Sequence, residues 1–286
     1  MDNKEILLIH LGGLGDMCLS ESTFFSLSEH FREGIVALGY TRFLSLFKGY
    51  FKGTERIESA KWLPLFSQST SDMKWQRIIF IGSDREGALR EKWGKISKEQ
   101  MIFIRMYPER SAINCHVEDF QLLQLGQYGI EAVKKETEAN LTRRVILYPE
   151  KGFKKKKWGY ENFLRLYNSL RDKGVNVYIL ASIGLEKDVK GAVFFEELAD
   201  VCDYFREGGI FVSNDSGMAH LAGMCGLYTV TIFNDFDPAV WHPRGHGTCL
   251  KSGKDSIDVP SIESRIMEAI KKTNVFYCNS RSFSEK

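Results

Sequence analysis

The 286-residue sequence lacks the features that mark several common classes of protein. No apolar stretch approaches the roughly 18 residues that a membrane-spanning helix needs, and the apolar run 6–9 is too short for a secretory leader. The six cysteines include no C-x-x-C pair, so free thiols in a reducing cytosol are expected rather than disulfides. The net charge is only +2, which gives no reason to expect a nucleic-acid partner. These absences predict a soluble cytoplasmic protein.

What the sequence does contain is a regular alternation of apolar runs and helical segments. The first half predicts strands at 5–11, 35–40, 77–81 and 101–106, and helices at 17–31 and 117–128. The second half predicts strands at 143–148 and 175–181, helices at 161–173, 195–206 and 261–272, and a strand–turn–helix–strand unit at 210–233. Continuous apolar runs that alternate with helices predict parallel sheets buried on both faces. The expected fold class is therefore α/β.

The chain length suits two domains of ordinary size. A charged stretch at 132–140, rich in Glu and Lys, is typical of a connector. The expected division is an N-terminal domain at 1–135, a C-terminal domain at 141–260, and a last helix and tail at 261–286. Ligands of parallel α/β sheets bind at the carboxyl ends of the strands, so two such sheets would face each other across a cleft.

The most informative segment is the unit at 210–233, IFVSNDSGMAHLAGMCGLYTVTIF, whose polar turn NDSG stands where a helix begins. Asp and Ser are favoured there because their oxygens accept hydrogen bonds from the first N–H groups of the helix. Those N–H groups, together with the helix dipole, also form an anion site. His220 lies one turn after Ser216 on the same helix face. The turn alone indicates either a phosphate site or a plain helix cap.

The same segment closely resembles the signature of glycosyltransferase family nine, the ADP-heptose:lipopolysaccharide heptosyltransferases, which is roughly N-D-S/T-G-x-x-H-L-A-A-A-x-G-x-P-T-V-x-L-F. The chain departs from that pattern at positions such as Gly223 and Tyr228, and neither of these changes removes a polar group that would hold a ligand. The resemblance implies the GT-B architecture, in which two Rossmann-like domains with parallel sheets face a central cleft. It also implies that this turn binds the diphosphate of a nucleotide sugar. The donor-binding residues would include Asp215, Ser216, Gly217 and His220.

The first glycine-rich turn, HLGGLGDM at 10–17, is a weak pattern by itself, because a plain strand-to-helix turn would also explain it. It resembles the N-terminal S-x-x-G-D pattern of the family, whose aspartate is proposed as the catalytic base, and this role transfers to Asp16. A carboxylate there could accept the proton of the acceptor hydroxyl as the sugar–phosphate bond breaks. The alternative is that Asp16 only caps its helix. Gly12 or Gly13 stands where relatives often have serine.

A basic run, PEKGFKKKKWGYENF at 149–163, follows one expected strand and precedes a helix. It resembles the G-x-x-x-K-x-W pattern of the family, and spacing from Trp158 makes Lys156 the matching lysine. The Lys156 ammonium would offset the charge that develops on the departing diphosphate. The resemblance also places Gly152 and Glu186 at donor-binding positions. A solvated face is the alternative for a run of lysines, and Trp158 is expected to pack rather than to bind.

Other segments concern the acceptor. The stretch 41–56 interleaves aromatic and basic residues, and most of it is expected to form a packed helix, although the pattern also suits an anionic lipid surface. Arg85, Arg105 and Arg110 are candidates for binding an anionic acceptor.

The loop 233–245 resembles the family's F-G-x-T-D/x-P-x-x-W-x-P-x-G loop, which borders the donor pocket.

The resemblance implies an inverting, metal-independent glycosyltransferase that moves heptose, or a related sugar, from an ADP-sugar to a lipopolysaccharide core or similar glycolipid. Its partners would be the nucleotide-diphosphate sugar, an anionic glycolipid acceptor and, peripherally, the cytoplasmic face of the inner membrane. No metal and no cofactor is expected, and His220, His242 and His246 lack the spacing of a metal site. Two alternatives stay open. The chain could use another nucleotide sugar or a protein acceptor, or it could be a non-catalytic nucleotide-sugar-binding subunit.

Overall fold

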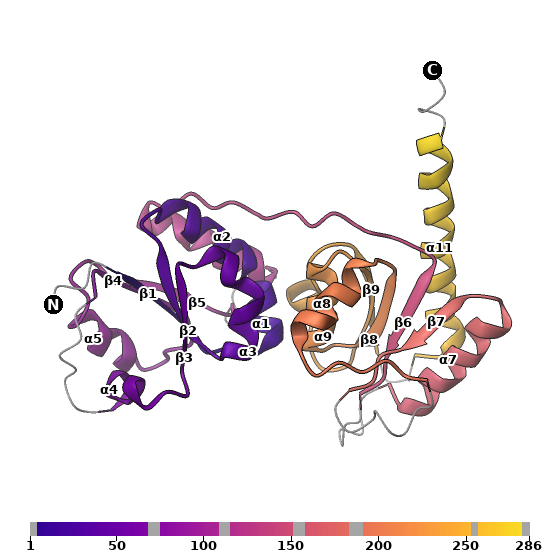
Figure 1. Cartoon of the computed structure of the whole chain (residues 1–286), viewed down its shortest axis with the longest axis horizontal. Helices are drawn as coiled ribbons and strands as arrows, with labels where there is room; N and C mark the ends of the chain where they lie inside the picture. Colours follow the sequence, from indigo (N-terminus) through magenta and orange to yellow (C-terminus); the bar gives the residue numbers. More distant parts are fainter. Residues whose placement is uncertain are drawn as a thin grey trace. The chain divides into compact units, whose positions relative to one another are not determined.

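The computed structural model describes residues 5–67, 75–108, 115–150, 158–182, 191–252 and 257–281. The chain divides into two compact units, Met1–Lys135 and Glu136–Lys286. Each unit is a parallel five-stranded sheet flanked by helices (Figure 1). The predicted α/β class with two parallel sheets is therefore confirmed. Four of the candidate residues named above lie outside the described residues, namely Arg110, Gly152, Lys156 and Glu186.

The first unit is built around the central strand β1, Ile6–His10, in the strand order β3-β2-β1-β4-β5. Neighbouring strands pair in parallel, so their carboxyl ends share one edge of the sheet. The other strands are β2 Ile35–Gly39, β3 Gly53–Arg56, β4 Arg77–Gly82 and β5 Ile102–Arg105. The helices are α1 Leu14–Leu19, α2 Glu21–His30, α3 Thr41–Leu44, α4 Leu63–Phe66, α5 Ala88–Gly94 and α6 Val117–Leu123, with 3-10 turns η1 Ser45–Tyr50, η2 Ala60–Trp62 and η3 Leu125–Tyr128.

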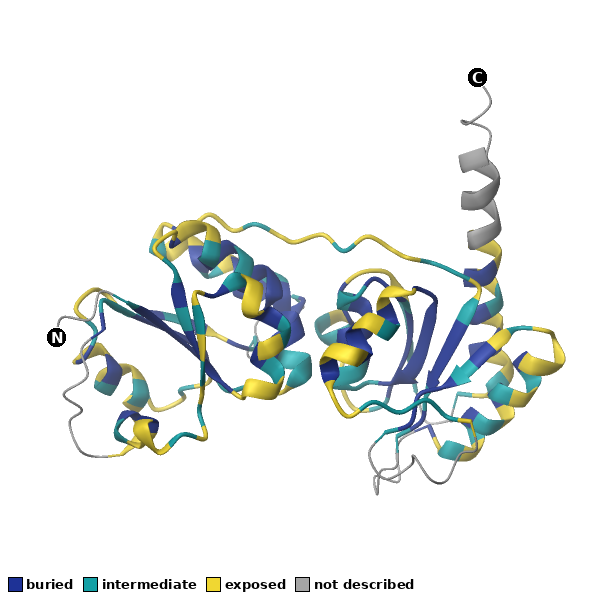
Figure 2. Cartoon of the chain, in the orientation of Figure 1, coloured by how far each residue is buried: buried dark blue, intermediate teal, exposed yellow. Residues whose placement is uncertain are grey.

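Strand β1 is buried along its whole length because both faces of the sheet are covered (Figure 2). On one face Leu7 and Ile9 belong to a core cluster with Trp93 of α5. On the other face the ring of His10 contacts the edge of Phe24 of α2, with ring centroids 5.5 Å apart. Burial on both faces is what the continuous apolar runs predicted.

Two local predictions for this unit are wrong. The single helix expected at 17–31 is two helices that meet at Ser20. The Ser20 hydroxyl donates to the carbonyl oxygen of Asp16 at 2.8 Å, and bonding of this kind bends helices. The helix expected over 41–56 ends early, because Gly53–Arg56 pairs with β2 as an edge strand. Only alternate residues of that strand are partly buried, so no apolar run marks it in the sequence.

The second unit has the strand order β10-β9-β8-β6-β7, again parallel throughout. Its strands are β6 Arg144–Tyr148, β7 Asn176–Ile179, β8 Ile210–Asn214, β9 Tyr228–Phe233 and β10 Gly247–Lys251, of which the last was not predicted. Its helices are α7 Tyr160–Asp172, α8 Leu198–Arg206, α9 Gly217–Met224, α10 Pro238–Trp241 and α11 Val259–Arg281.

The helices of the second unit lie on opposite faces of its sheet (Figure 1). On one face, Phe163 and Leu166 of α7 join Ile262 and Ile266 of α11 in a core cluster. Helices α8 and α9 cover the other face. Helix α11 was expected to end at residue 272. It packs into this core and continues to Arg281.

Candidate functional site

The turn from β8 to α9 has the geometry of a capped helix N-terminus. Ser216 is the N-cap, with extended backbone at φ −161° and ψ 160°, and its Oγ accepts a hydrogen bond from the Ala219 N–H at 3.3 Å. The N–H of Asp215 donates to the carbonyl oxygen of Ile232 in β9 at 2.9 Å, which fixes the turn to the sheet. The first N–H groups of a helix have no partner within it, and the dipole adds positive charge there. This end of α9 can therefore receive an anion.

Four of the predicted donor-binding residues lie in this turn and in the first turn of α9. Gly217 is the first residue of α9, directly after Asp215 and Ser216. His220 lies one turn further along, and its Nε2 is 4.0 Å from Oδ1 of Asp215. The Asp215 side chain is 19% exposed and that of His220 only 6%. Asp215 therefore offers more surface to a bound molecule than His220 does.

Asn214, which ends β8, is a feature of this site that the sequence analysis did not single out. It is 1% exposed, and its side-chain amide binds the backbone of Trp158 twice. Oδ1 accepts from the Trp158 N–H at 3.0 Å, and Nδ2 donates to the Trp158 carbonyl at 3.3 Å. The residue that follows the basic run is thus fixed beside the signature turn. The Asn of the NDSG motif was the available signal for this contact.

Trp158 itself packs into the core, as predicted. It is 5% exposed, and its ring meets the ring of Phe163 nearly edge-on, with centroids 4.7 Å apart. Its indole N–H donates to the carbonyl oxygen of Ile257 at 2.7 Å. The side chain is therefore an anchor that joins the start of α7 to the segment before α11.

The loop after β9 lies at the same edge of the sheet, because β8 and β9 are parallel neighbours. Asp237 caps α10, and its Oδ1 accepts from the Ala239 N–H at 3.0 Å. The ring of Trp241 contacts the half-exposed Phe236, with centroids 5.5 Å apart. A Cβ placed on Gly223 of α9 would lie 2.2 Å from the carbonyl oxygen of Arg244. That close approach explains why glycine replaces the alanine of the signature at this position.

In the first unit, Asp16 lies in the turn that follows β1. It is the third residue of α1, and its Oδ2 accepts a hydrogen bond from the N–H of the N-cap Gly13 at 2.8 Å. The capping role that was the alternative for Asp16 therefore exists in the structure. The side chain is nevertheless only partly buried. A carboxylate that caps its own helix keeps further lone pairs with which it can accept a proton from a substrate.

Tyr107 is a second partner of Asp16 that the sequence analysis missed. It follows β5, and its hydroxyl is hydrogen-bonded to the Asp16 carboxylate. Burial, the nearby negative charge of Asp16 and this bond together raise the pKa of Tyr107 above its ordinary value. The phenol therefore stays protonated and donates. No spacing in the sequence links residues so far apart, so only the sheet topology could reveal this pair.

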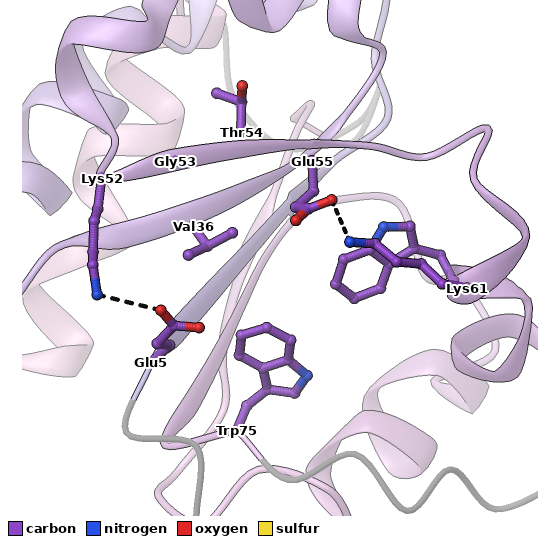
Figure 3. A pocket seen from close by; sticks show the side chains of 9 residues that line it. Glu5, Val36, Lys52, Gly53, Thr54, Glu55, Lys61 and Trp75 are labelled. Atoms are coloured by element: carbon purple, nitrogen blue, oxygen red, sulfur yellow. Dashed lines mark hydrogen bonds and ion pairs between the residues drawn. The ribbon is translucent and has the colours of Figure 1, made fainter.

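The first unit also has a cavity of about 460 Å³, at the opposite end of β1 from Asp16 (Figure 3). Glu5, which precedes β1, pairs with Lys52 at 3.2 Å, and Glu55 pairs with Lys61 at 2.7 Å. The charges that line the cavity are thus neutralised in pairs. Because it lies away from the carboxyl ends of the strands, we do not include it in the candidate site.

In the aromatic and basic stretch at 41–56, aromatic rings pack inward while basic side chains are exposed. Phe47 and Phe51 are buried, and the ring of each lies 5.4 Å from that of Phe24. The Tyr50 hydroxyl donates to Glu21 at 2.7 Å. The charged residues Arg42, Lys48 and Arg56 are exposed, as are the acceptor candidates Arg85 and Arg105. Within the described segments, no helix is long and apolar enough to cross a bilayer.

A metal-binding cluster is not found among the residues that the structure describes. No three His, Cys, Asp or Glu side chains in those segments gather closely enough to hold an ion. Near the signature turn, Cys249 of β10 is a neutral thiol, because burial and the adjacent Asp215 raise its pKa to about 11.

Comparison with known proteins gives one family and several similar folds. Residues 116–253 match the model of glycosyltransferase family 9 (heptosyltransferase). The chain is similar to a family 9 glycosyltransferase from Veillonella parvula, with 13% identity and a TM-score of 0.72 over 95% of this chain and 98% of that one. It is also similar to E. coli heptosyltransferase WaaC with ADP, with 13% identity and a TM-score of 0.68 over 93% and 99% of the two chains.

A third similar structure is E. coli ADP-heptose lipopolysaccharide heptosyltransferase II, with 13% identity and a TM-score of 0.68 over 94% of this chain and 99% of that one. No curated protein sequence matches the chain. The structural matches establish the GT-B fold. Residues 116–253 are thus similar to the glycosyltransferases of that family.

Proposed function

We propose that this chain, which carries a glycosyltransferase family 9 domain over residues 116–253, is an inverting transferase that moves heptose or a related sugar from an ADP-sugar to a glycolipid. The observation that supports this most strongly is the β8–α9 turn. There Asp215, Ser216 and Gly217 stand at a capped helix N-terminus, as the family signature requires.

The donor would bind to the second unit through its diphosphate. The N–H groups at the start of α9 would bind the phosphate oxygens, and His220 would lie beside them. Lys156 and Gly152 come from the run that ends at Trp158, which Asn214 holds next to this turn. In this proposal Glu186 binds hydroxyls of the donor, as the resemblance implies.

Transfer would require a base and a stabilised leaving group. The Asp16 carboxylate takes the proton from the acceptor hydroxyl, whose oxygen forms a bond to the anomeric carbon of the sugar. The bond from that carbon to the diphosphate breaks, and ADP leaves with the electron pair. Direct displacement inverts the anomeric centre. Lys156 and the N-terminus of α9 offset the charge on ADP, so the proposal needs no metal or cofactor.

The acceptor is proposed to be anionic, a lipopolysaccharide core or a similar glycolipid at the cytoplasmic face of the inner membrane. The exposed side chains of Arg85 and Arg105, together with Arg110, are the candidates to bind it. The alternatives are a protein acceptor, another nucleotide sugar, and binding without turnover. The thermal-shift panel below tests the nucleotide sugar, and an assay of ADP release in the presence of the acceptor tests turnover.

A thermal-shift panel of nucleotide sugars tests the donor. A ligand present at about 100 times its Kd adds roughly 2.7 kcal/mol of stability, which is easily detected. We expect ADP-heptose and ADP to raise Tm, and UDP- or GDP-sugars to have little effect. A shift with another nucleotide would replace the donor but keep the reaction class. The absence of a shift with every nucleotide would contradict the proposal.

A further inference from the structure

His10 is a buried histidine that the proposed reaction does not use directly. It is the last residue of β1, it has no exposed surface, and it lies next to the Asp16 turn. Burial lowers its pKa to about 3, so the ring is neutral at physiological pH. A neutral imidazole has one nitrogen that donates and one that accepts, and its neighbours decide which is which.

The hydrogen bonds around His10 select one tautomer. The N–H of Gly12 donates to Nδ1 at 3.3 Å, so Nδ1 must be the acceptor. Ser20 Oγ lies 3.1 Å from Nε2, but its single hydroxyl hydrogen is already donated to the carbonyl oxygen of Asp16 at 2.8 Å. Nε2 therefore carries the proton and donates to Ser20. The result is a directed chain of bonds from His10 through Ser20 to the backbone of Asp16.

The ring also limits the space available to the turn. A Cβ on Gly12 would lie 2.8 Å from Cε1 of His10, 2.6 Å from Cβ of Asp16 and 2.9 Å from its Oδ2. Only glycine fits between the imidazole and the carboxylate. The backbone of Gly12 is thus confined on one side by the His10 ring and on the other by the Asp16 side chain.

We propose that His10 is a positioning residue for Asp16: its neutral Nε2–H tautomer binds the turn at Gly12 and, through Ser20, at the Asp16 backbone, and so fixes the direction of the carboxylate. This inference rests on the proposed function, because it assumes that Asp16 is the base. A base that is misplaced by about 1 Å can cost on the order of 100-fold in rate, so support of this kind changes kcat.

The test compares His10→Gln, His10→Phe and a matched core variant. Gln keeps a donor for Ser20, whereas Phe fills the space but cannot donate. Phe47→Leu is the control, because Phe47 is buried against the same Phe24 ring but belongs to η1 and not to the Asp16 turn. With the donor selected by the thermal-shift panel, we expect His10→Phe to lower kcat by about 10- to 100-fold with the donor KM nearly unchanged. His10→Gln should recover part of that loss, and Phe47→Leu should retain kcat.

A second measurement does not depend on activity. Nitrogen-15 NMR of the imidazoles should show His10 protonated only at Nε2 from about pH 5 to about pH 8. An Nδ1-protonated or doubly protonated ring would overturn the inference, as would a His10→Phe kcat within twofold of that of Phe47→Leu. The variant Asp16→Asn distinguishes a failure of the proposed function from a failure of the inference about His10. Full turnover in that variant refutes the proposed role of Asp16, whereas an inactive Asp16→Asn beside a fully active His10→Phe refutes only the role of His10.

Discussion

The side-chain amide of Asn214 holds both backbone polar groups of Trp158, with an accepted bond of 3.0 Å and a donated bond of 3.3 Å. The two residues are far apart in sequence, and Asn214 is almost completely buried. The Asn of the signature therefore has a structural task that differs from that of the Asp and Ser after it. It fixes Trp158, the residue that follows the lysine-containing run, beside the turn that leads to α9.

Asn214→Ala should weaken both stability and donor binding. The change leaves the buried N–H and C=O of Trp158 without these partners, which costs about 1–3 kcal/mol of unfolding free energy. Urea denaturation measures that loss, and calorimetry with ADP measures the affinity. Asn176→Ala, at an exposed position of β7, is the control and should change neither quantity. Unchanged ADP affinity in a destabilised Asn214→Ala protein would show that this contact supports the fold alone.

Lys156→Ala should lower the affinity for the donor. A charge-assisted bond to a phosphate contributes about 1.5–3 kcal/mol, which corresponds to roughly 10- to 100-fold in Kd. Titration calorimetry with the ADP-sugar gives the value directly. Lys155→Ala, in the same basic run, is the matched control and should bind almost as the wild type does. Equal binding by both variants and the wild type would remove Lys156 from the donor site.

The buried His10 should make stability fall at acid pH. Its pKa is about 3 in the folded protein, whereas a histidine in the unfolded chain has a pKa near 6.5. Between these values the unfolded state binds one more proton, so the unfolding free energy decreases by about 1.4 kcal/mol per unit as pH falls. The stabilisation is complete above about pH 6.5. The His10→Gln variant cannot take up this proton, so its unfolding free energy lacks this part of the dependence on pH.

Urea midpoints measured at several values between about pH 7.5 and about pH 4.5 test this, because the other five histidines contribute equally to both proteins. The wild type should lose stability relative to His10→Gln below about pH 6.5. Parallel curves would mean that His10 titrates normally and is not held neutral.

The sequence was sufficient to predict the fold class and most of the strands. Continuous apolar runs such as Ile6–His10 indicated strands buried on both faces, and the NDSG turn indicated a capped helix. The edge strand Gly53–Arg56 and the outer strand Gly247–Lys251 were not predicted, because neither contains an apolar run. The interruption of the helix at Ser20 was not predicted, because it depends on one side-chain hydrogen bond to the preceding turn.

The candidate site could be predicted only where its residues adjoin in sequence. Asp215, Ser216 and Gly217 form one turn, and a local motif is enough to find them. The bond from Tyr107 to Asp16 and the two bonds from Asn214 to Trp158 join distant segments. Such contacts follow from strand order, which no single motif encodes. His10 was unremarkable in the sequence, since its importance lies in how its ring is buried.

Asp16→Asn decides whether the chain is a transferase of the proposed kind. The amide keeps the shape of the side chain and can still accept the bond from Gly13, but it cannot take a proton. With the donor selected by the thermal-shift panel, calorimetry should give an unchanged donor affinity, and an assay of ADP release in the presence of acceptor should show no turnover. Turnover close to that of the wild type would contradict the proposed reaction.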